Sequence, residues 1–358
     1  MRKQPNASAR YRNIKSTAGR RRVTFVATDV STGGGVNRVI CDLSALFARK
    51  LGLYTEVLVA RSATPPTYRF DPAVRLRFGG SGGIFHYIRQ LWQLRSSRSD
   101  FVIGSWTQDN IILLAVFLFS KSRVIVVEHS SWDFHGPIVR ALRWVLYRCA
   151  FHVVALNPTD ELHYRRYLAN VSLIPNPVKR VLSSRSREKL LIAVGHLESL
   201  KNFDDAIHAF HQSMLDQDGW TFSILGSGSK EAHLRELGRR LGVKNLNIVT
   251  EMAEVGDWYA RASLIAVTSV TEVFSLALAE AMAAGVIPIA YKADGPTFLL
   301  EDFPEHLVTI GDVDGLAARM ARFARMHHRD DMREAFRHSV DSRFSPEFIA
   351  AEWRRLLG

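Results

Sequence analysis

The chain has 358 residues, and at about 150 residues per domain this length predicts two domains. Hydrophobic residues make up 47% of the chain and charged residues 23%, a balance that excludes a disordered protein. The two cysteines, Cys41 and Cys149, are too few for a disulfide framework or a cysteine-rich zinc site, and they fit a reducing compartment. The longest uninterrupted apolar run, residues 111–119, is shorter than the ~20 residues of a spanning helix. We see no secretory signal.

The formal net charge is +12, and its distribution is uneven. Residues 1–22 hold eight basic residues and no acidic one, so the remainder carries only +4. This segment lacks periodicity, which predicts a disordered basic arm. Such an arm could solubilise the chain or contact an anionic surface, either lipid or nucleic acid. No nucleic-acid-binding motif accompanies it, so we expect no nucleic-acid partner.

The first half alternates β-rich runs with helical stretches, which predicts a parallel sheet covered by helices. The predicted strands are residues 22–28, 55–60, 74–78, 101–105, 124–128 and 152–156. The predicted helices are residues 37–51, 84–98, 110–119, 138–149 and 158–168. Residues 23–176 are therefore predicted to form an N-terminal Rossmann-like domain.

Residues 177–189 are polar and interrupt the alternation, as an interdomain linker would. Strands then follow at residues 190–194, 221–225, 246–249, 264–268 and 287–290, and helices at residues 202–214, 230–241, 274–284 and 314–326. Residues 190–342 are predicted to form a second domain, and a helix within residues 343–358 to pack back on the first. The predicted fold class is α/β, with two doubly wound domains facing a cleft that the carboxyl ends of the strands line.

The segment 273–285 is apolar except for Ser275 and Glu280, which predicts a largely buried helix. A buried carboxylate needs hydrogen-bond donors, so Glu280 should bind either ribose hydroxyls or amides and arginines of its own domain. Glu272 lies just before this helix, where an acid caps free amides or accepts bonds from sugar hydroxyls.

The amides of Phe274, Ser275 and Leu276 would face an anion such as a diphosphate.

A second cluster follows the predicted strand 190–194 and includes Gly195, His196 and Lys201. A lysine between a strand end and a helix start suits phosphate binding, although a solvated surface lysine has the same pattern. Asn202 is a predicted N-cap, with Asp205 three residues later as in a capping box.

Three further features each have a structural alternative. Glycines at Gly33, Gly34 and Gly35 allow a ligand to approach the backbone, or form a tight turn. His129 follows a strand at the predicted cleft edge, where a lone histidine is either functional or structural. Gly226 opens a glycine-serine segment after another strand, a weaker candidate for phosphate or ribose binding.

Together these segments resemble the retaining glycosyltransferases of family 4, which have the GT-B fold. The resemblance covers most of the chain, from about Val23 to the C-terminal helix. Glu272 and Glu280, separated by seven residues, look like the family's E-x7-E motif. The segment 194–203 resembles its Gly-Arg-Leu…Lys segment, residues 174–177 its Pro-Asn-Gly, and Gly33–Gly35 its glycine-rich loop.

The resemblance implies a role for each position. Glu280 would bind the ribose of a nucleotide diphosphate sugar, and Glu272, with the amides of residues 274–276, would hold the donor sugar. Lys201 would neutralise the leaving diphosphate, and His129 would line the sugar pocket. The Gly33–Gly35 loop would close over the diphosphate or the acceptor. Gly195, His196 and Gly226 complete the predicted donor site.

Transfer would retain the anomeric configuration, and no metal or other cofactor is expected.

The sequence departs from the family at three positions. His196 stands where the family usually has arginine, Val273 replaces the glycine after the first glutamate, and Pro177 replaces the last glycine of Pro-Asn-Gly. A histidine titrates near neutrality, whereas an arginine does not, so diphosphate binding is weaker or another arginine substitutes.

The alternatives that stay open are a catalytically silent nucleotide-sugar-binding homologue, a nucleotide-sugar epimerase or hydrolase of the same fold, and a nucleic-acid-binding protein, which the absence of a nucleic-acid-binding motif disfavours.

Segments 84–98 and 138–148 mix apolar, aromatic and basic residues. Basic amphipathic helices lie on anionic membranes, although ordinary helices with snorkelling arginines have the same composition. With the basic arm, they suggest a lipid-linked or lipopolysaccharide acceptor. We therefore predict a cytoplasmic, peripheral transferase in surface polysaccharide or glycolipid synthesis, with a UDP-hexose or UDP-N-acetylhexosamine as the first choice of donor and GDP-mannose as the second.

Overall fold

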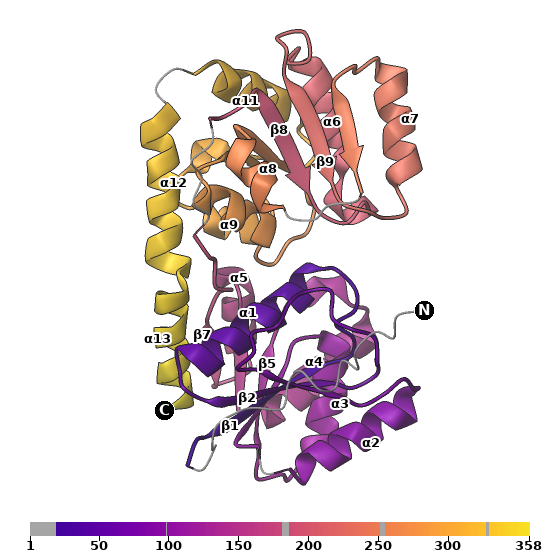
Figure 1. The fold of residues 1–358 in the computed structure, drawn as a ribbon, viewed down its shortest axis with the longest axis vertical. Coiled ribbons are helices and arrows are strands. Elements are labelled where there is room, and N and C mark those ends of the chain that lie inside the picture. The colour runs from indigo at the N-terminus through magenta and orange to yellow at the C-terminus, as the bar shows by residue number, and fades with distance from the viewer. Residues whose placement is uncertain (1–18, 98, 181–185, 251–254, 327–328) are drawn as a thin grey trace, which may run out of the picture. The chain divides into compact units, whose positions relative to one another are not determined.

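The computed structural model describes residues 19–97, 99–180, 186–250, 255–326 and 329–358. Contacts divide the chain into two compact units, Met1–Pro177 with Ile349–Gly358, and Val178–Phe348. Each unit contains one parallel sheet with flanking helices (Figure 1). Residues 1–18 of the predicted arm and 181–185 of the predicted linker lie outside the described residues.

The first strand begins at Arg22, as predicted, and the Arg21 guanidinium before it donates to the carbonyl of Leu357.

The strands of the first unit are β1 (Arg22–Ala27), β2 (Tyr54–Val59), β3 (Arg75–Phe78), β4 (Phe101–Gly104), β5 (Arg123–Val127), β6 (His152–Ala155) and β7 (Val171–Leu173). The α-helices are α1 (Gly35–Arg49), α2 (Ile84–Arg95), α3 (Thr107–Phe117), α4 (Pro137–Leu146), α5 (Pro158–Arg165) and the late α13 (Pro346–Leu357). Short 3-10 turns η2 (Trp132–Phe134) and η3 (Tyr147–Cys149) flank α4.

The seven strands lie in the order β3-β2-β1-β4-β5-β6-β7, so the strand order reverses between β1 and β4. The inner strands β1 and β4 are buried along almost their whole length, as expected of parallel strands that are covered on both faces. Helices α2, α3 and α5 pack on the face that presents Val26 and Val102. On the opposite face Phe47 of α1 contacts both Phe25 of β1 and Trp353 of α13.

The strands of the second unit are β8 (Leu190–Val194), β9 (Thr221–Leu225), β10 (Leu246–Val249), β11 (Leu264–Val267), β12 (Ile287–Tyr291) and β13 (Leu307–Val308). The α-helices are α6 (Phe203–Gln212), α7 (Glu231–Leu241), α8 (Gly256–Arg261), α9 (Leu276–Ala283), α10 (Asp294–Leu299), α11 (Val313–Arg325) and α12 (Arg329–Phe344). Short 3-10 turns are η4 (Ser199–Lys201) and η5 (Pro304–His306). The sheet order is β10-β9-β8-β11-β12-β13, and it reverses between β8 and β11.

Several elements are absent from the sequence prediction: β7, β13, α8, α10 and α12. The strands among them are short edge segments, whose few residues carry little periodicity. Helix α12 is strongly polar, and its buried apolar residues Phe336, Val340 and Phe344 recur only once per turn. It forms because this narrow stripe packs against α9 and β12. Among the described residues, we find no helix with the length and apolar character that crossing a membrane requires.

Candidate functional site

The point where the strand order of the second unit reverses brings two charged side chains together. Lys201 lies in the loop after β8, and Glu272 lies in the loop after β11. The Lys201 Nζ atom is 2.5 Å from Glu272 Oε2. Both side chains are partly accessible, with exposed fractions of 28% and 18%. Open α/β sheets bind ligands at such a position, because the loops on either side of the reversal diverge and leave a crevice.

Backbone contacts between the two loops fix the position of Lys201. The carbonyl oxygen of Lys201 accepts a 2.9 Å hydrogen bond from the Thr268 hydroxyl, and that of Leu200 accepts one from the amide of Val270. The lysine stem also runs past Gly195, where a Cβ atom would lie 3.1 Å from Lys201 Cε. The lysine is therefore held along the loop rather than extending freely into solvent.

Asn202 follows Lys201 in the left-handed conformation, with a φ of 48°. It stands at the N-cap position of α6 as predicted, but its side chain makes no capping bond. Its amide donates instead to Asp205 Oδ2 at 2.7 Å, and Tyr291 at the end of β12 donates to the same oxygen. The predicted capping box is therefore wrong, and Asp205 anchors the residue after Lys201.

Glu272 is oriented by Lys201 and by Ser269, whose hydroxyl donates to Glu272 Oε2 at 3.1 Å. Its carbonyl oxygen accepts a 2.7 Å bond from the amide of Gly295, at the start of α10. A Cβ atom at Gly295 would lie 2.7 Å from the amide nitrogen of Phe274, so only glycine allows this close approach. The alternative role of Glu272 as a helix cap is excluded, because α9 begins after Ser275 without a side-chain cap.

Helix α9 starts two residues later than predicted, after Ser275 in the left-handed conformation. Phe274 is buried and its ring contacts Phe344, so its side chain is structural, while Leu276 is partly exposed. Glu280 was expected to be buried, and this is wrong: it lies on the partly exposed side of α9. The nearly continuous apolar sequence of residues 273–285 predicts a buried helix, but it does not show whether one side of that helix is accessible to solvent.

The loops after β8 and β9 touch through their glycines. A Cβ atom at Gly226 would lie 1.9 Å from the carbonyl oxygen of Gly195, so no larger residue fits there. Beyond this contact, Glu198 accepts bonds from the amide and hydroxyl of Ser229, and these bonds lower the pKa of Glu198. His196 is exposed between these two anchored positions. Gly226, Gly195, Lys201 and Glu272 thus lie in the loops after three adjacent strands, β9, β8 and β11, whereas Glu280 lies within α9.

The remaining predicted residues belong to the first unit. His129 follows β5, and burial lowers its pKa to about 4, so the ring is neutral at physiological pH. Its Nε2 atom is enclosed without a hydrogen-bond partner in the described part of the chain. The Gly33–Gly35 segment leads from β1 into α1, and the amide of Gly34 donates to the Tyr68 hydroxyl at 3.1 Å.

Glu128, the neighbour of His129, is fully buried, and sequence reasoning missed its importance. It accepts hydrogen bonds from Thr107 (3.1 Å), Asn110 (2.9 Å) and Arg143 (2.8 Å), and another from Tyr147. An acid that ends an otherwise apolar strand was the available signal. Its partners come from α3, α4 and η3, and only the tertiary structure assembles them.

Sequence reasoning also missed Thr268, Ser269 and Gly295, which position Lys201 and Glu272. Thr268 and Ser269 could have been noticed as small polar residues at the end of an apolar strand. Gly295 gave no signal, because it lies 23 positions after the carbonyl that its amide contacts.

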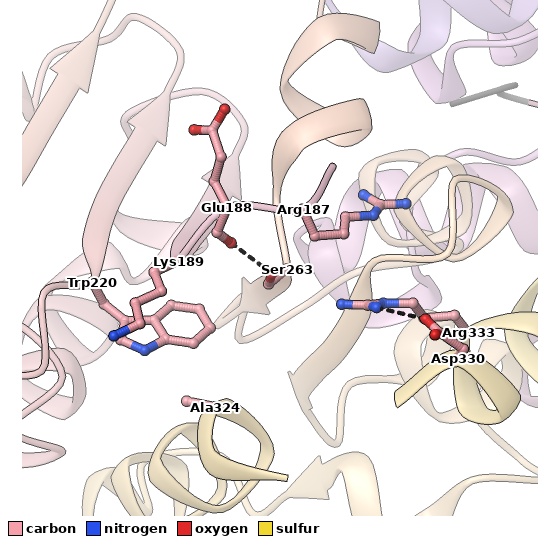
Figure 2. Close-up of a pocket in the computed structure, with 8 residues that line it drawn as sticks. All are labelled: Arg187, Glu188, Lys189, Trp220, Ser263, Ala324, Asp330 and Arg333. Carbon is pink, nitrogen blue, oxygen red and sulfur yellow. Dashed lines mark hydrogen bonds and ion pairs between the residues drawn. The ribbon is translucent and has the colours of Figure 1, made fainter. Parts of the chain in front are cut away.

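A pocket of about 430 Å³ lies elsewhere in the second unit and is lined by Arg187, Lys189, Trp220, Ser263 and Arg333, among others (Figure 2). Lys189, Trp220 and Ser263 immediately precede β8, β9 and β11. The pocket therefore lies at the amino ends of the parallel strands, whereas Lys201 and Glu272 lie at their carboxyl ends. Arg187 there donates to the carbonyls of Tyr259 and Ala262, and burial lowers its pKa to about 10.

Residues 177–339 match the family model described as "Glycosyl transferases group 1". The second unit, which contains almost all of this match, belongs to the group 1 glycosyltransferases. The whole chain is 24% identical to the amylovoran biosynthesis glycosyltransferase AmsD of Erwinia amylovora, over 92% of this chain and 97% of that protein. A transferase of Campylobacter jejuni, named for adding α-1,4-N-acetyl-D-galactosamine to an undecaprenol-diphosphate-linked saccharide, is 26% identical over 74% of this chain and 76% of its own.

The fold of this glycosyltransferase matches that of HepE from Anabaena, whose structure contains UDP. The TM-score is 0.77 at 15% identity, covering 94% of this chain and 99% of HepE. The likeness establishes the two-domain α/β architecture of the GT-B type. The predicted family and fold class are therefore confirmed.

Proposed function

We propose that this glycosyltransferase moves a hexose or N-acetylhexosamine from a nucleotide diphosphate sugar to a saccharide or lipid-linked saccharide acceptor, with retention of anomeric configuration. The observation that carries the proposal is the Lys201–Glu272 pair, partly exposed where the strand order of the second unit reverses. A cation held there meets the negative charge that develops on a departing diphosphate. When one hydrogen-bond donor to such a developing charge is removed from an enzyme, the rate falls by roughly 10²–10³.

In the proposed reaction the bond between the anomeric carbon and the diphosphate oxygen breaks, and its electron pair leaves with the diphosphate. The acceptor oxygen forms the new bond from the same face and passes its proton to the departing phosphate. Lys201 and the free amides at the start of α9 receive the charge, so we propose a reaction without a metal ion. Glu272 accepts bonds from the donor sugar hydroxyls, since its carboxylate has oxygen lone pairs beyond those that bind Lys201 and Ser269.

Glu280 binds the ribose in this proposal, from the partly exposed edge of α9. Gly195, Gly226 and His196 line the diphosphate side, where the absence of Cβ atoms allows the loops to approach closely. His129 and the Gly33–Gly35 loop serve the sugar and the acceptor from the first unit. UDP is our first choice of nucleotide, which the UDP in the HepE structure supports.

The acceptor we favour is a growing polysaccharide or a lipid-linked saccharide. The names of two relatives support this choice: one transferase acts in amylovoran biosynthesis, and the other adds a sugar to an undecaprenol-linked saccharide. With such an acceptor, we propose that the enzyme works at the inner face of the cytoplasmic membrane.

The first test measures the melting temperature with UDP-, GDP-, ADP- and dTDP-sugars. A ligand at 100 times its dissociation constant adds about 2.7 kcal/mol of stability, which raises the melting temperature visibly. We expect the sugars of one nucleotide to raise the melting temperature, and we expect Glu280→Ala to abolish this rise. The matched control is Glu236→Ala, an exposed acid on α7 outside the site. No response to any nucleotide sugar would contradict the proposed donor site.

Product analysis then separates the alternatives. Incubation of the stabilising donor with an acceptor lipid extract should release the nucleoside diphosphate and yield a glycosylated acceptor. A changed sugar on an intact donor would indicate an epimerase instead. Free sugar without acceptor product would indicate a hydrolase, and binding without any turnover a silent homologue.

A further inference from the structure

The pocket at the amino ends of the second unit's strands has a wall of cations (Figure 2). Arg187 and Lys189, just before β8, line it together with Arg333 of α12. Glu188, an acid of the lining, is engaged by Arg261 at 2.7 Å. The volume of about 430 Å³ lies in the range of small-molecule sites and has room for more than an inorganic ion. We call this cavity the amino-edge pocket.

Arg187 is a cation without a counter-charge, since no carboxylate pairs with it in the described part of the chain. Its guanidinium donates to the carbonyls of Tyr259, Ala262 and Ala284, at the ends of α8 and α9. These three bonds leave two of the five N–H groups of the guanidinium for a further acceptor. Binding two helix ends thus accounts for the position of Arg187, but neutral carbonyl oxygens do not cancel its charge.

Two other arginines lie close to Arg187. Arg337 donates to the same Ala284 carbonyl oxygen at 3.3 Å, so two guanidiniums meet at one neutral acceptor. Burial, together with the positive charges of Arg333 and Arg337, lowers the pKa of Arg187 to about 10. Like charges held together in a partly buried place are unfavourable, and a bound anion would offset this cost. The arrangement therefore favours an anion beside Arg187.

Arg333 has an acidic partner that it can exchange. Its side chain is only 13% exposed, whereas Asp330, which accepts its 3.0 Å bond, is 94% exposed. Arg333 Nε is enclosed without a hydrogen-bond partner among the described residues. An ion pair with so exposed a carboxylate contributes little stability, so Asp330 can give way to another anion. An unmet donor and an exchangeable partner suit Arg333 to phosphate binding.

The amino-edge pocket is separate from the proposed donor site. Lys189 immediately precedes β8, and Gly195 immediately follows it. The five residues of this strand span roughly 17 Å, so the two places lie at opposite edges of one sheet. An anion beside Arg187 and a diphosphate beside Lys201 are therefore different molecules.

We propose that the amino-edge pocket binds a small organic phosphate, with its phosphate group between Arg187 and Arg333 and its organic part toward Trp220. Guanidiniums recognise phosphate through paired hydrogen bonds. Figure 2 shows the two guanidiniums on one side of the pocket and the Trp220 indole on the other, beside Lys189. Trp220 and Ala324 add apolar surface that an inorganic ion would leave unused. This site is independent of the proposed transfer reaction.

The test is isothermal titration calorimetry of the full chain with ribose 5-phosphate, which has a phosphate and a sugar ring but no nucleobase. We expect binding at low salt that weakens as salt is added. Inorganic phosphate should bind about tenfold more weakly, because it leaves the Trp220 side of the pocket unfilled. Lys201→Ala should leave the affinity for ribose 5-phosphate unchanged, which separates this pocket from the donor site.

Variants of the pocket should change the affinity in both directions. Arg333→Gln should raise the Kd about tenfold, because a charge-assisted hydrogen bond is lost. The matched control is Arg239→Gln on α7, since this arginine also pairs with an acid three residues before it. Asp330→Asn removes a competing carboxylate and should lower the Kd severalfold. Arg187→Gln should raise the Kd as well, and if that variant fails to fold, the Arg333 and Asp330 variants still decide the question.

Three results would overturn the proposal. The first is no binding of ribose 5-phosphate at low salt. The second is binding that Lys201→Ala abolishes and Arg333→Gln leaves intact, which would assign the phosphate to the donor site. The third is equal affinity for inorganic phosphate and ribose 5-phosphate, which would contradict the place given to the organic part. All these measurements follow binding without turnover, so their failure leaves the proposed transfer reaction standing.

Discussion

The two units each place an acid–cation pair after the end of a parallel strand, and the two pairs have opposite characters. In the first unit Glu128 and Arg143 are fully buried. Glu128 receives hydrogen bonds from four side chains, which is about the capacity of a carboxylate. In the second unit Glu272 receives bonds from Lys201 and Ser269 and remains partly exposed.

The difference separates a structural pair from one that is available to a ligand. A saturated buried pair fixes the elements around it, here α3, α4 and η3, and cannot exchange partners without a large cost. A partly exposed pair with spare lone pairs can exchange a partner for a sugar hydroxyl or a phosphate. Accessibility and remaining hydrogen-bond capacity, rather than the residue types, therefore distinguish the two.

The largest expected effect comes from breaking the buried pair. Glu128→Gln leaves Arg143 buried without its counter-charge, so the free energy of unfolding should fall by about 3–5 kcal/mol. Urea denaturation followed by circular dichroism measures it. The control is Glu161→Gln, which breaks the more exposed pair with Arg165 and should cost less than about 1 kcal/mol. Equal effects of the two variants would refute the structural role of Glu128.

Breaking the partly exposed pair should affect activity rather than stability. Lys201→Ala and Glu272→Ala should each lower transfer by roughly 10²–10³, because the charge on the diphosphate and the sugar hydroxyls lose their partners. Their free energies of unfolding should stay within about 1 kcal/mol of the parent value. Initial rates and urea denaturation of the same samples test both statements. Near-normal turnover in both variants would exclude this site from catalysis.

His129 offers a pH-dependent test beside the buried pair. Burial lowers its pKa from the ordinary 6.5 to about 4, so the unfolded chain binds the proton at higher pH than the folded chain. The resulting stabilisation is complete above pH 6.5 and disappears as the pH falls towards 4, with a maximum of about 3 kcal/mol. The free energy of unfolding, measured by urea denaturation between pH 4 and 7.5, should therefore change less with pH in His129→Gln than in the parent protein. An unchanged slope would contradict the burial of the ring.

The smallest effect concerns how the second unit positions Lys201. Tyr291→Phe removes the 2.7 Å hydrogen bond to Asp205, which also anchors Asn202 next to the lysine. We expect a loss of about 1–2 kcal/mol in stability and a severalfold fall in transfer rate with little change in donor affinity. The measurement is kcat and KM separately. A fall in affinity alone would place Tyr291 in donor binding instead.

The sequence by itself determined the alternating β/α pattern, the division into two α/β halves and the positions of Lys201 and Glu272 after two apolar strands. These features are local, because apolar runs and strand-end polar residues are visible without knowing what they contact. Short elements such as β7 and β13 were missed because they carry too few residues to show periodicity.

The tertiary structure alone decided the environments of the charged groups. The Glu128 cluster draws on residues from three separate elements, and the approach of Gly295 to the Glu272 carbonyl joins loops far apart in sequence. The burial of Arg143 in a helix whose apolar residues Ile138, Leu142 and Val145 are exposed reverses what helical periodicity predicts. Burial and hydrogen-bond saturation depend on contacts between distant segments, and those contacts leave no pattern in a local stretch of sequence.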